Sequence, residues 1–485
     1  MKAFFVYPPP WAPWAPSYAT ALLFAAAKQR GHKMIPVDVN IELHNGVDPA
    51  NRDWWADHKA QQWSDEAFLN DLWADQTGVL HPIVARIAAS GSRLCAFSVN
   101  SSSVAFAQLM ARKIKEQNPS VTILFGGPHC FRSEGGLELL NDPSVDAVCT
   151  GEGDLAWPNF LDAFQKNGNR LSDVQGICYK RADGSVVDCG DPELVDDLDT
   201  LPYADFSWAD RKKYSILNRL CLMMSRGCIN RCAYCSEGPN FKKYRYRSAD
   251  NLFEEVRRNV HRLTKSFPIP WLGGKTVATP FINFNDSLIN GCPEVLDAFC
   301  DRVIRDGLSF NWGGMAVFRK EMTRELLAKM KQAGFVEVMW GLESGCEETL
   351  RLMNKKIFTP AIAERILKDA TELGIQQYAN IIVGFPGETE PMFLETVAFV
   401  VRNIHHFRLL GLPLMEIRRN SRVYDKYQEY GVESPVPMIW KSTDNLNTYE
   451  LRMARRKLLA TLIENKMFDQ GRYKDKPQSA ELAAA

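Results

Sequence analysis

Residues 224–235 read Met-Ser-Arg-Gly-Cys-Ile-Asn-Arg-Cys-Ala-Tyr-Cys, and this stretch decides what the chain can be. The apolar run that leads into it, Leu222–Ser225, predicts a strand, so Cys228, Cys232 and Cys235 lie on the loop directly after a strand. Three thiolates within eight residues can bind three irons of a cubane cluster and leave the fourth iron without a protein ligand. The same spacing also allows a zinc-binding or simply buried role, and a structural zinc site would require a fourth ligand.

The overall composition is that of an ordinary globular chain. Lys and Arg total 58 and Asp and Glu total 58, and this net charge of zero argues against a general binder of nucleic acid. Hydrophobic residues make up 46% and charged residues 24% of the 485 residues, which supplies a core of normal size. No run approaches the about 18 apolar residues of a membrane span, and Pro8–Pro10 interrupts the first apolar run too early for a signal peptide. We therefore expect a cytoplasmic protein with no membrane span.

The nine cysteines outside this loop are scattered along the chain, and several stand in apolar runs. In a large chain without a secretion signal they do not suggest a disulfide scaffold, and each is interpreted as a small buried hydrophobe. No cysteine follows Cys346, so the C-terminal part cannot hold a second cluster ligated by cysteine.

Strands and helices are expected to alternate from about residue 220 onward. About five or six such units are too few for a complete eight-unit barrel, so the pattern predicts a partial barrel. The predicted strands are Leu222–Ser225, Phe281–Phe284, Ser309–Val317, Val336–Trp340 and Tyr378–Val383. The predicted helices are Ala249–Thr264, Val295–Asp306, Thr323–Gln332, Thr359–Leu373 and Glu390–Val401. Thr323 is a candidate N-cap, and Gly334 a candidate helix stop.

The N-terminal segment also alternates strands and helices, which predicts an α/β fold with a doubly wound parallel sheet. Its apolar runs end in loops rich in small residues, such as Gly126-Gly127-Pro128-His129 and Gly151-Glu152-Gly153. The ligands of such sheets bind at the carboxyl ends of the strands, where these loops gather. The predicted strands are Lys2–Tyr7, Lys33–Val39, Leu94–Val99, Val121–Phe125 and Asp146–Thr150.

Four tryptophans at positions 54, 55, 63 and 73 interrupt this alternation between residues 45 and 76. We expect a helical insertion that packs the tryptophans, with an aromatic substrate lid as the alternative. Ala182–Ser185 predicts a hairpin turn. The expected domains are residues 1–175, a hairpin and connector 176–210, the partial barrel 211–408, and a C-terminal segment 409–485 on the substrate side with a disordered tail.

The cysteine run resembles the signature of radical S-adenosylmethionine enzymes, over about residues 220–403. Gly341-Leu342-Glu343-Ser344-Gly345 and Ile381-Ile382-Val383-Gly384-Phe385-Pro386-Gly387-Glu388-Thr389 match its fourth and fifth strands. The resemblance implies a [4Fe-4S] cluster on the three cysteines. The open iron of this cluster binds S-adenosylmethionine, which is cleaved to a 5′-deoxyadenosyl radical that abstracts hydrogen from a substrate. The cofactors carry the chemistry while the protein orients them.

The resemblance also assigns contacts with S-adenosylmethionine. Tyr234 is the aromatic neighbour of the adenine, and Gly384 and Phe385 supply backbone beside it. Glu343 and Ser344 match positions that contact the ribose or the methionyl part.

The second strand departs from the family. Asn283-Phe284-Asn285-Asp286 replaces the usual glycine-rich segment that binds the amino group. Asp286 is then the candidate acceptor for the ammonium, and Arg319 after the third strand is the candidate for the carboxylate.

The N-terminal domain, over about residues 1–165, resembles the cobalamin-binding class of this family, which includes the class B-like methyltransferases and their relatives. That resemblance places the corrin over strand-end loops whose small residues permit close packing. The candidate cobalamin contacts are Pro9, Ser101, Ser102, Gly126, Gly127, His129, Gly151, Glu152 and Gly153. The Asp-x-His-x2-Gly motif that supplies a histidine to cobalt is absent, so we expect no strong protein ligand below the cobalt.

The sequence thus predicts a cobalamin-dependent radical enzyme that methylates an unactivated carbon of a small-molecule substrate. The resemblance implies a low-potential electron donor such as flavodoxin or ferredoxin. One alternative is a cyclase, rearrangement or oxidation enzyme of the same architecture. Another is a non-catalytic iron–sulfur or zinc-binding protein, which the aromatic residue before Cys235 and the downstream glycine-rich strands disfavour.

Overall fold

A computed structural model describes residues 1–167, 174–263 and 279–469, and the chain divides into two compact units, Met1–Cys221 and Leu222–Ala485. The hairpin expected between domains joins the sheet of the first unit. The tail expected to be disordered lies outside the described residues. Within the described residues, no helix has the length and apolar character needed to cross a bilayer.

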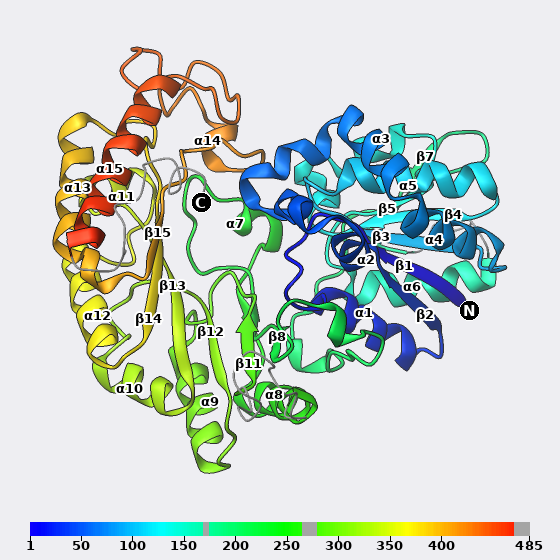
Figure 1. The fold of residues 1–485 in the computed structure, drawn as a ribbon, viewed down its shortest axis with the longest axis horizontal. Coiled ribbons are helices and arrows are strands. Elements are labelled where there is room, and N and C mark those ends of the chain that lie inside the picture. Colours follow the sequence, from blue (N-terminus) through cyan, green and yellow to red (C-terminus); the bar gives the residue numbers. More distant parts are fainter. Residues whose placement is uncertain (168–173, 264–278, 470–485) are drawn as a thin grey trace. The chain divides into compact units, whose positions relative to one another are not determined.

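The first unit is built on a seven-stranded sheet in the order β2-β1-β3-β4-β5-β6-β7 (Figure 1). Strands β1 to β5 run parallel, and β6 and β7 add an antiparallel hairpin at one edge. The predicted doubly wound sheet and hairpin are therefore confirmed. The strands are β1 (Lys2–Tyr7), β2 (Lys33–Asp38), β3 (Leu94–Ser98), β4 (Thr122–Gly126), β5 (Ala147–Cys149), β6 (Ile177–Lys180) and β7 (Val186–Asp188).

Helices cover both faces of this sheet because successive side chains of each buried strand point to opposite faces. In β1, Phe4 and Val6 pack on one side, and Ala3 and Phe5 on the other. The first side is covered by α2 (Val39–Gly46), α3 (Glu66–Asp75), α4 (Thr77–Ala89) and α5 (Val104–Gln117), and the second by α1 (Tyr18–Gln29) and α6 (Gly153–Asn167).

The tryptophan-rich insertion belongs to the first of these cores. Trp55, Trp63 and Trp73 are buried there, and Trp54 packs against them. The Trp63 indole donates to the carbonyl of Trp54 at 2.8 Å, and the Trp55 indole to Asn40 at 2.7 Å. These contacts confirm a packed insertion and exclude the lid, because these rings are already used inside the unit.

Five strands of the second unit, together with β8 at the boundary between the units, form a six-stranded sheet in the order β15-β14-β13-β12-β11-β8, which confirms the predicted partial barrel. Strands β11 to β15 run parallel. The strands are β8 (Arg219–Leu222), β11 (Phe281–Phe284), β12 (Asn311–Ala316), β13 (Phe335–Glu343), β14 (Gln376–Ile381) and β15 (Leu409–Gly411). A short pair, β9 (Ser225–Arg226) and β10 (Arg245–Tyr246), flanks the cysteine loop and α7 (Glu237–Phe241).

The connecting helices begin and end where the sequence provides caps. The Thr323 hydroxyl accepts from the amide of Leu326 at the start of α10, as predicted. Gly334 ends that helix at φ +94°, where an added methyl group would overlap the carbonyl of Phe310. The helices are α8 (Ala249–Leu263), α9 (Pro293–Arg305), α10 (Arg324–Gln332), α11 (Glu347–Leu352), α12 (Pro360–Glu372) and α13 (Glu390–Asn403).

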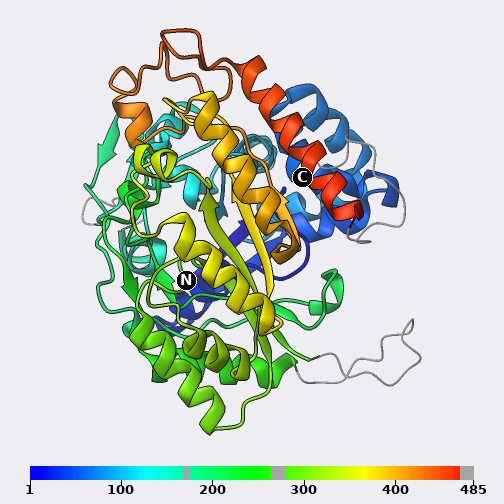
Figure 2. The ribbon, with the colours of Figure 1, turned by 90° about the vertical axis from the view of Figure 1, so that its left-hand side faces the viewer.

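The C-terminal segment folds back onto the cysteine loop within the second unit. After β15 it contains α14 (Arg422–Asp425) and α15 (Tyr449–Asp469), and α15 lies beside α13 (Figure 2). The amide of Val423 donates to the carbonyl of Ala233 at 2.9 Å. One apolar cluster joins both parts of the chain and contains Ala233, Met353, Phe385, Met415, Ile417, Val423, Val432 and Trp440.

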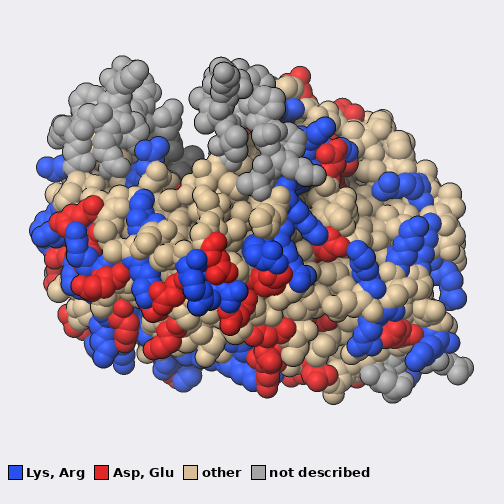
Figure 3. All heavy atoms as spheres, turned by 90° about the horizontal axis from the view of Figure 1, so that it is seen from below, with Lys and Arg blue, Asp and Glu red and all other residues tan. Residues whose placement is uncertain are grey.

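The surface charges agree with the balanced composition. On the face seen in Figure 3, basic and acidic side chains lie interspersed. Many of the acidic side chains pair with nearby cations, such as Glu254 with Arg257 and Arg258 in α8.

Candidate functional site

The cysteine loop leaves β9 through Gly227, whose φ is +76°. A methyl group added there would lie 2.7 Å from the carbonyl oxygen of Lys243, so only glycine fits this turn. Cys228, Cys232 and Cys235 follow, and all three are partly buried. Burial raises the pKa of each thiol, and that of Cys235 reaches about 12.

Repulsion from the Cys232 and Cys228 thiolates adds to the effect of burial in raising the pKa of Cys235, so the three thiols of the loop interact electrostatically. Among the residues that the structure describes, no three His, Cys, Asp or Glu side chains are grouped to hold a single metal ion. The loop therefore supplies three neighbouring sulfur donors that are not preformed as a one-ion site.

A buried ammonium faces this loop, and the sequence analysis did not find it. The Lys355 side chain is only 5% exposed, and its Nζ lies 3.2 Å from Glu343 Oε1 and 3.5 Å from the Tyr234 hydroxyl. Burial alone would lower the pKa of Lys355, but the charges of Glu343 and Cys232 raise it above its usual value. In return, Lys355 lowers the pKa of Cys228 and Cys232 against the larger effect of burial. Positive charge is thus fixed beside two of the three thiols.

Glu343 reaches Lys355 through an unusual backbone conformation. It ends β13 at φ +66°, after a register shift between Trp340 and Glu343 against β14. A non-glycine residue in this region costs about 1–3 kcal/mol, and such residues gather at functional sites. The neighbouring Ser344 points elsewhere: it is buried and bonds the Thr396 hydroxyl at 2.7 Å. The structure therefore brings Glu343, but not the Ser344 hydroxyl, to the cysteine loop.

Gly384 and Phe385 follow β14 in a turn whose backbone groups are bonded by side chains of the protein. Gly384 has φ +83°, and its amide donates to Glu388 Oε2 at 2.9 Å. Burial raises the pKa of the Glu388 carboxyl to about 7 against the opposing charge of Arg455. Phe385 is fully buried in the apolar cluster that also contains Ala233. The turn therefore packs against the cysteine loop through side chains.

Asp286 and Arg319 are held by contacts with their own unit. The Asp286 carboxylate accepts from the amides of Met224 and Ser225 and from the Ser225 hydroxyl, which ties the start of the cysteine loop to β11. Burial raises the pKa of Asp286 to about 7. Arg319 pairs with Glu321 at 2.9 Å and donates to the carbonyls of Asn290 and Gly291. Their predicted contacts with the amino acid part of S-adenosylmethionine stay predictions.

In the first unit, the predicted cobalamin residues gather at the carboxyl ends of four adjacent strands, β1, β3, β4 and β5. Ser101 is exposed and Ser102 half-buried, whereas Pro9 and Glu152 are buried. His129 is half-buried, and its amide donates to the carbonyl of Val99.

Several glycines of this set serve close packing of the chain itself. Gly127 has φ +101°, and a methyl group there would lie 2.7 Å from the Val99 carbonyl oxygen. A methyl group on Gly151 would overlap the ring of Pro192, and one on Gly126 would touch Cys149 at 3.6 Å. Gly153 begins α6, and a methyl group added to it would lie 3.5 Å from the Leu23 side chain.

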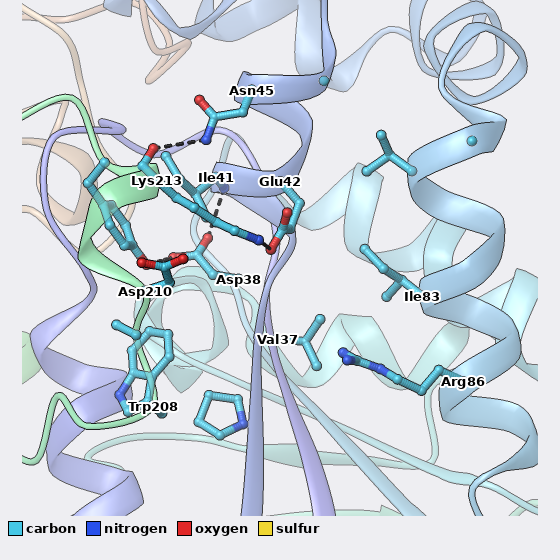
Figure 4. A pocket seen from close by; sticks show the side chains of 16 residues that line it. Val37, Asp38, Ile41, Glu42, Asn45, Ile83, Arg86, Trp208, Asp210 and Lys213 are labelled. Carbon is cyan, nitrogen blue, oxygen red and sulfur yellow. Dashed lines mark hydrogen bonds and ion pairs between the residues drawn. The ribbon is translucent and has the colours of Figure 1, made fainter.

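A hollow of the first unit, about 600 Å³ in volume, contains none of the predicted residues. It lies between the end of β2, helices α2 and α4, and residues 208–214 (Figure 4). At one end, Lys213 pairs with Glu42 at 2.5 Å, and the buried Asp38 accepts from the Tyr214 hydroxyl at 2.7 Å. Burial raises the pKa of Asp38 to about 6. The other end is lined by Val37, Ile83 and Arg86. The carboxylates of Glu42 and Asp38 are thus already bonded, to Lys213 and Tyr214.

Comparisons with known proteins agree with this geometry. Residues 295–400 match the family described as the Radical SAM superfamily. The chain is 29% identical over 298 residues to an uncharacterized methyltransferase of Pyrococcus horikoshii, covering 60% of each chain. It is 27% identical to the anaerobic magnesium-protoporphyrin IX monomethyl ester cyclase of Rubrivivax gelatinosus, covering 58% of this chain and 49% of the cyclase. The matched region thus spans about half to three fifths of these relatives.

Two solved structures share the fold. OxsB, a cobalamin-dependent S-adenosylmethionine radical enzyme with aqua-cobalamin and S-adenosylmethionine bound, superposes with a TM-score of 0.69 and 16% identity. That match covers 100% of this chain and 70% of OxsB. TsrM from Kitasatospora setae, a radical S-adenosylmethionine methyltransferase, superposes with a TM-score of 0.63 and 16% identity over 89% of this chain and 77% of TsrM. Residues 295–400 therefore match the Radical SAM superfamily, and the chain as a whole has the fold seen in OxsB and TsrM.

Proposed function

We propose that this protein is a cobalamin-dependent radical S-adenosylmethionine enzyme that methylates an unactivated carbon of a small molecule. The observation that carries the proposal is the loop of three neighbouring thiols with the buried Lys355–Glu343 pair beside it. The fold match supports it further, because that match extends through the N-terminal unit as well as the radical domain.

The donor set suits a [4Fe-4S] cluster. Cys228, Cys232 and Cys235 supply three sulfur ligands, and the buried ammonium of Lys355 offsets the negative charge that thiolates bring into a partly buried site. When bound, the cluster supplies the electron that cleaves S-adenosylmethionine to a carbon radical. The protein holds the loop in place through Asp286, which fixes the backbone at Met224 and Ser225.

The same geometry favours Lys355 as the group that receives the carboxylate of S-adenosylmethionine. Arg319, the cation chosen from the sequence, already binds Glu321 and two carbonyls. Lys355 instead lies beside Tyr234, and its charge lowers the pKa of Cys228 and Cys232 in the loop that would hold the cluster. Glu343, held at positive φ, lies where it orients Lys355 and can accept from the ammonium or ribose of the cofactor.

Cobalamin would bind over the strand-end loops of the first unit, where the polar and small residues of four adjacent strands gather. Among the predicted contacts, Ser101, Ser102 and His129 are polar residues that are at least partly exposed. We expect no strong protein ligand to the cobalt, because the Asp-x-His-x2-Gly motif is absent. The enzyme also needs a one-electron donor of low potential, such as a flavodoxin or ferredoxin.

A second candidate is a cyclase or other radical enzyme that transfers no methyl group. It is favoured by the 27% identity to the magnesium-protoporphyrin ester cyclase, which matches nearly as much of this chain as the methyltransferase relative does. Both candidates require the same cysteine loop, so they differ in the products formed.

The test measures both products of S-adenosylmethionine in the same reaction. Anaerobically reconstituted full-length protein is given cobalamin, a reductant and candidate substrates from the pathway encoded by neighbouring genes. A methyltransferase makes 5′-deoxyadenosine and S-adenosylhomocysteine in about equal amounts, since each turnover consumes two molecules of S-adenosylmethionine. Substrate-dependent 5′-deoxyadenosine without S-adenosylhomocysteine would favour the cyclase, and no cleavage at all would refute both.

A further inference from the structure

The turn Gly384–Glu388, called here the Gly384 turn, is held by side chains from the C-terminal segment. The Asn447 amide nitrogen donates to the carbonyls of Gly384 and Phe385, at 3.2 Å each. Arg452 donates to the amide oxygen of Asn447 at 3.3 Å, which fixes the orientation of that amide. Two residues about sixty positions further along the chain therefore determine where these two carbonyls point.

Arg452 is itself fully buried and strongly held. Its guanidinium stacks on Trp440 at 3.9 Å from the ring centroid and donates to the carbonyls of Met438 and Trp440 at 2.9 and 2.8 Å. Its stem lies so close to Gly384 that an added methyl group there would overlap the Arg452 side chain. Its Nε is buried without a hydrogen-bond partner among the described residues, so the bonds of the two terminal nitrogens and the stacking on Trp440 are what hold the guanidinium in place.

The backbone N–H of Gly384 is held indirectly by α15, the helix that also contains Arg452. Gly384 donates to Glu388, whose buried carboxylate lies 3.5 Å from Arg455. Arg455 also binds Glu390 at 2.8 Å. The C-terminal segment thus acts on the N–H of Gly384 through Arg455 and Glu388, and on its C=O through Asn447, which precedes α15.

We infer that Asn447 and Arg452 are positioning residues for the adenine of S-adenosylmethionine. The inference rests on the proposed function, in which the adenine lies beside the Gly384 turn. Since both polar groups of Gly384 are bonded within the protein, the turn offers the adenine a fixed shape instead of free hydrogen bonds from this residue. A change of shape would then weaken binding of the adenosyl part and leave the amino acid part unaffected.

The experiment compares two ligands that share the amino acid part. Full-length protein is reconstituted with iron and sulfide without oxygen, and its iron content is measured. Titration calorimetry then gives the dissociation constants for S-adenosylmethionine and for L-methionine, which lacks the adenosine. The variants are Arg452→Met and, as a second route to the same turn, Asn447→Leu. The matched control is Lys457→Met, which removes an exposed cation from the same helix.

We expect both variants to raise the dissociation constant for S-adenosylmethionine about tenfold, the effect of one lost hydrogen bond to a positioned group. Their affinity for L-methionine and their iron content should stay within about twofold of wild type, as should both affinities of Lys457→Met. Unchanged S-adenosylmethionine affinity in both variants, or equal weakening of both ligands, would overturn the inference. Failure of the proposed function is a different result, because the wild-type protein would then bind neither ligand.

Discussion

The cysteine loop of the second unit and the strand-end loops of the first unit were both expected to bind cofactors, but they rest on different kinds of residue. The cysteine loop presents thiols, a phenol, a carboxylate and a buried ammonium, whose chemistry limits what they can bind. The strand-end loops present mainly glycine, serine and proline, which act through shape. Gly127 and Gly151 show the difficulty, because the chain itself fills the space that their missing side chains leave. A sequence indicates the role of a reactive side chain, such as a thiol, from its chemistry. A small residue, in contrast, can be needed either to pack the chain itself or to admit a ligand, and the sequence does not distinguish the two.

The largest expected effect tests the chemical side of this comparison. Replacing Cys228, Cys232 or Cys235 with Ala should abolish reductive cleavage of S-adenosylmethionine, because a cubane with only two protein ligands is not retained. Iron content and 5′-deoxyadenosine are measured without oxygen. Cys300→Ala, a buried cysteine in α9, is the control and should keep about four irons. Near-normal 5′-deoxyadenosine from any loop variant would show that these thiols are not the ligands.

The next effect concerns the residue that the sequence analysis missed. Lys355→Met should weaken S-adenosylmethionine binding by about a hundredfold, since it leaves Glu343 partly buried without its partner and removes the cation facing the carboxylate. Titration calorimetry gives the affinity, and Lys356→Met, an exposed neighbour, is the control. If Lys355→Met binds like wild type while Arg319→Met does not, the sequence-based choice of Arg319 is the right one.

A pH effect tests the one strongly perturbed carboxyl in the hollow of the first unit. The folded protein raises the pKa of Asp38 from 3.8 to about 6 through burial, so the folded state binds the proton more tightly than the unfolded state. The stability from this proton is fully present below pH 3.8 and is lost as the pH rises through 6. Between pH 4 and 7.5, wild type should therefore lose about 2–3 kcal/mol relative to Asp38→Asn. Urea unfolding at both pH values measures the difference, and a constant gap would contradict it.

The smallest expected effect tests whether Gly151 is a glycine because of packing within the protein or because of contact with the corrin. Gly151→Ala should lower the free energy of unfolding by about 1–2 kcal/mol, because its methyl group overlaps Pro192. Adding Pro192→Ala should restore much of this loss if packing is the whole reason for the glycine. If the double variant is stable but retains no cobalamin after desalting, as judged by visible absorption, then Gly151 also faces the corrin.

The predictions from sequence were confirmed where the periodicity of apolar residues or the chemistry of a single side chain allowed few alternative structures. The parallel sheets, the packed tryptophans and the helix cap at Thr323 follow from periodicity and local chemistry, and all were found. Lys355 was missed because a lysine in the polar run after α11 is expected to be exposed. In the structure the carbonyl of Met353 accepts from the amide of Ala233 in the cysteine loop, and Lys355 is buried. The role of Ser344 was equally hidden, since only the fold sets its hydroxyl against Thr396.

The C-terminal contribution to the site was out of reach for a further reason. Asn447 and Arg452 act on carbonyls of Gly384 and Phe385, and no pattern in either stretch indicates the other. Bonds between side chains and distant backbone depend on tertiary packing, which a single sequence does not reveal. Asp286 illustrates the same limit, because its position suggested a ligand contact while its carboxylate binds the backbone before the cysteine loop.

The covering of the cysteine loop by the C-terminal segment has a consequence for biosynthesis. Ala233 is bonded by Val423, which leaves the ribosome about 190 residues after it, or roughly 10–40 s later at about 5–20 residues per second. During that interval the loop with the three thiols lacks its contact with Val423. Iron–sulfur delivery during translation would therefore meet a loop that is not yet held by the C-terminal segment, whereas delivery to the finished protein meets one that is already bonded to it.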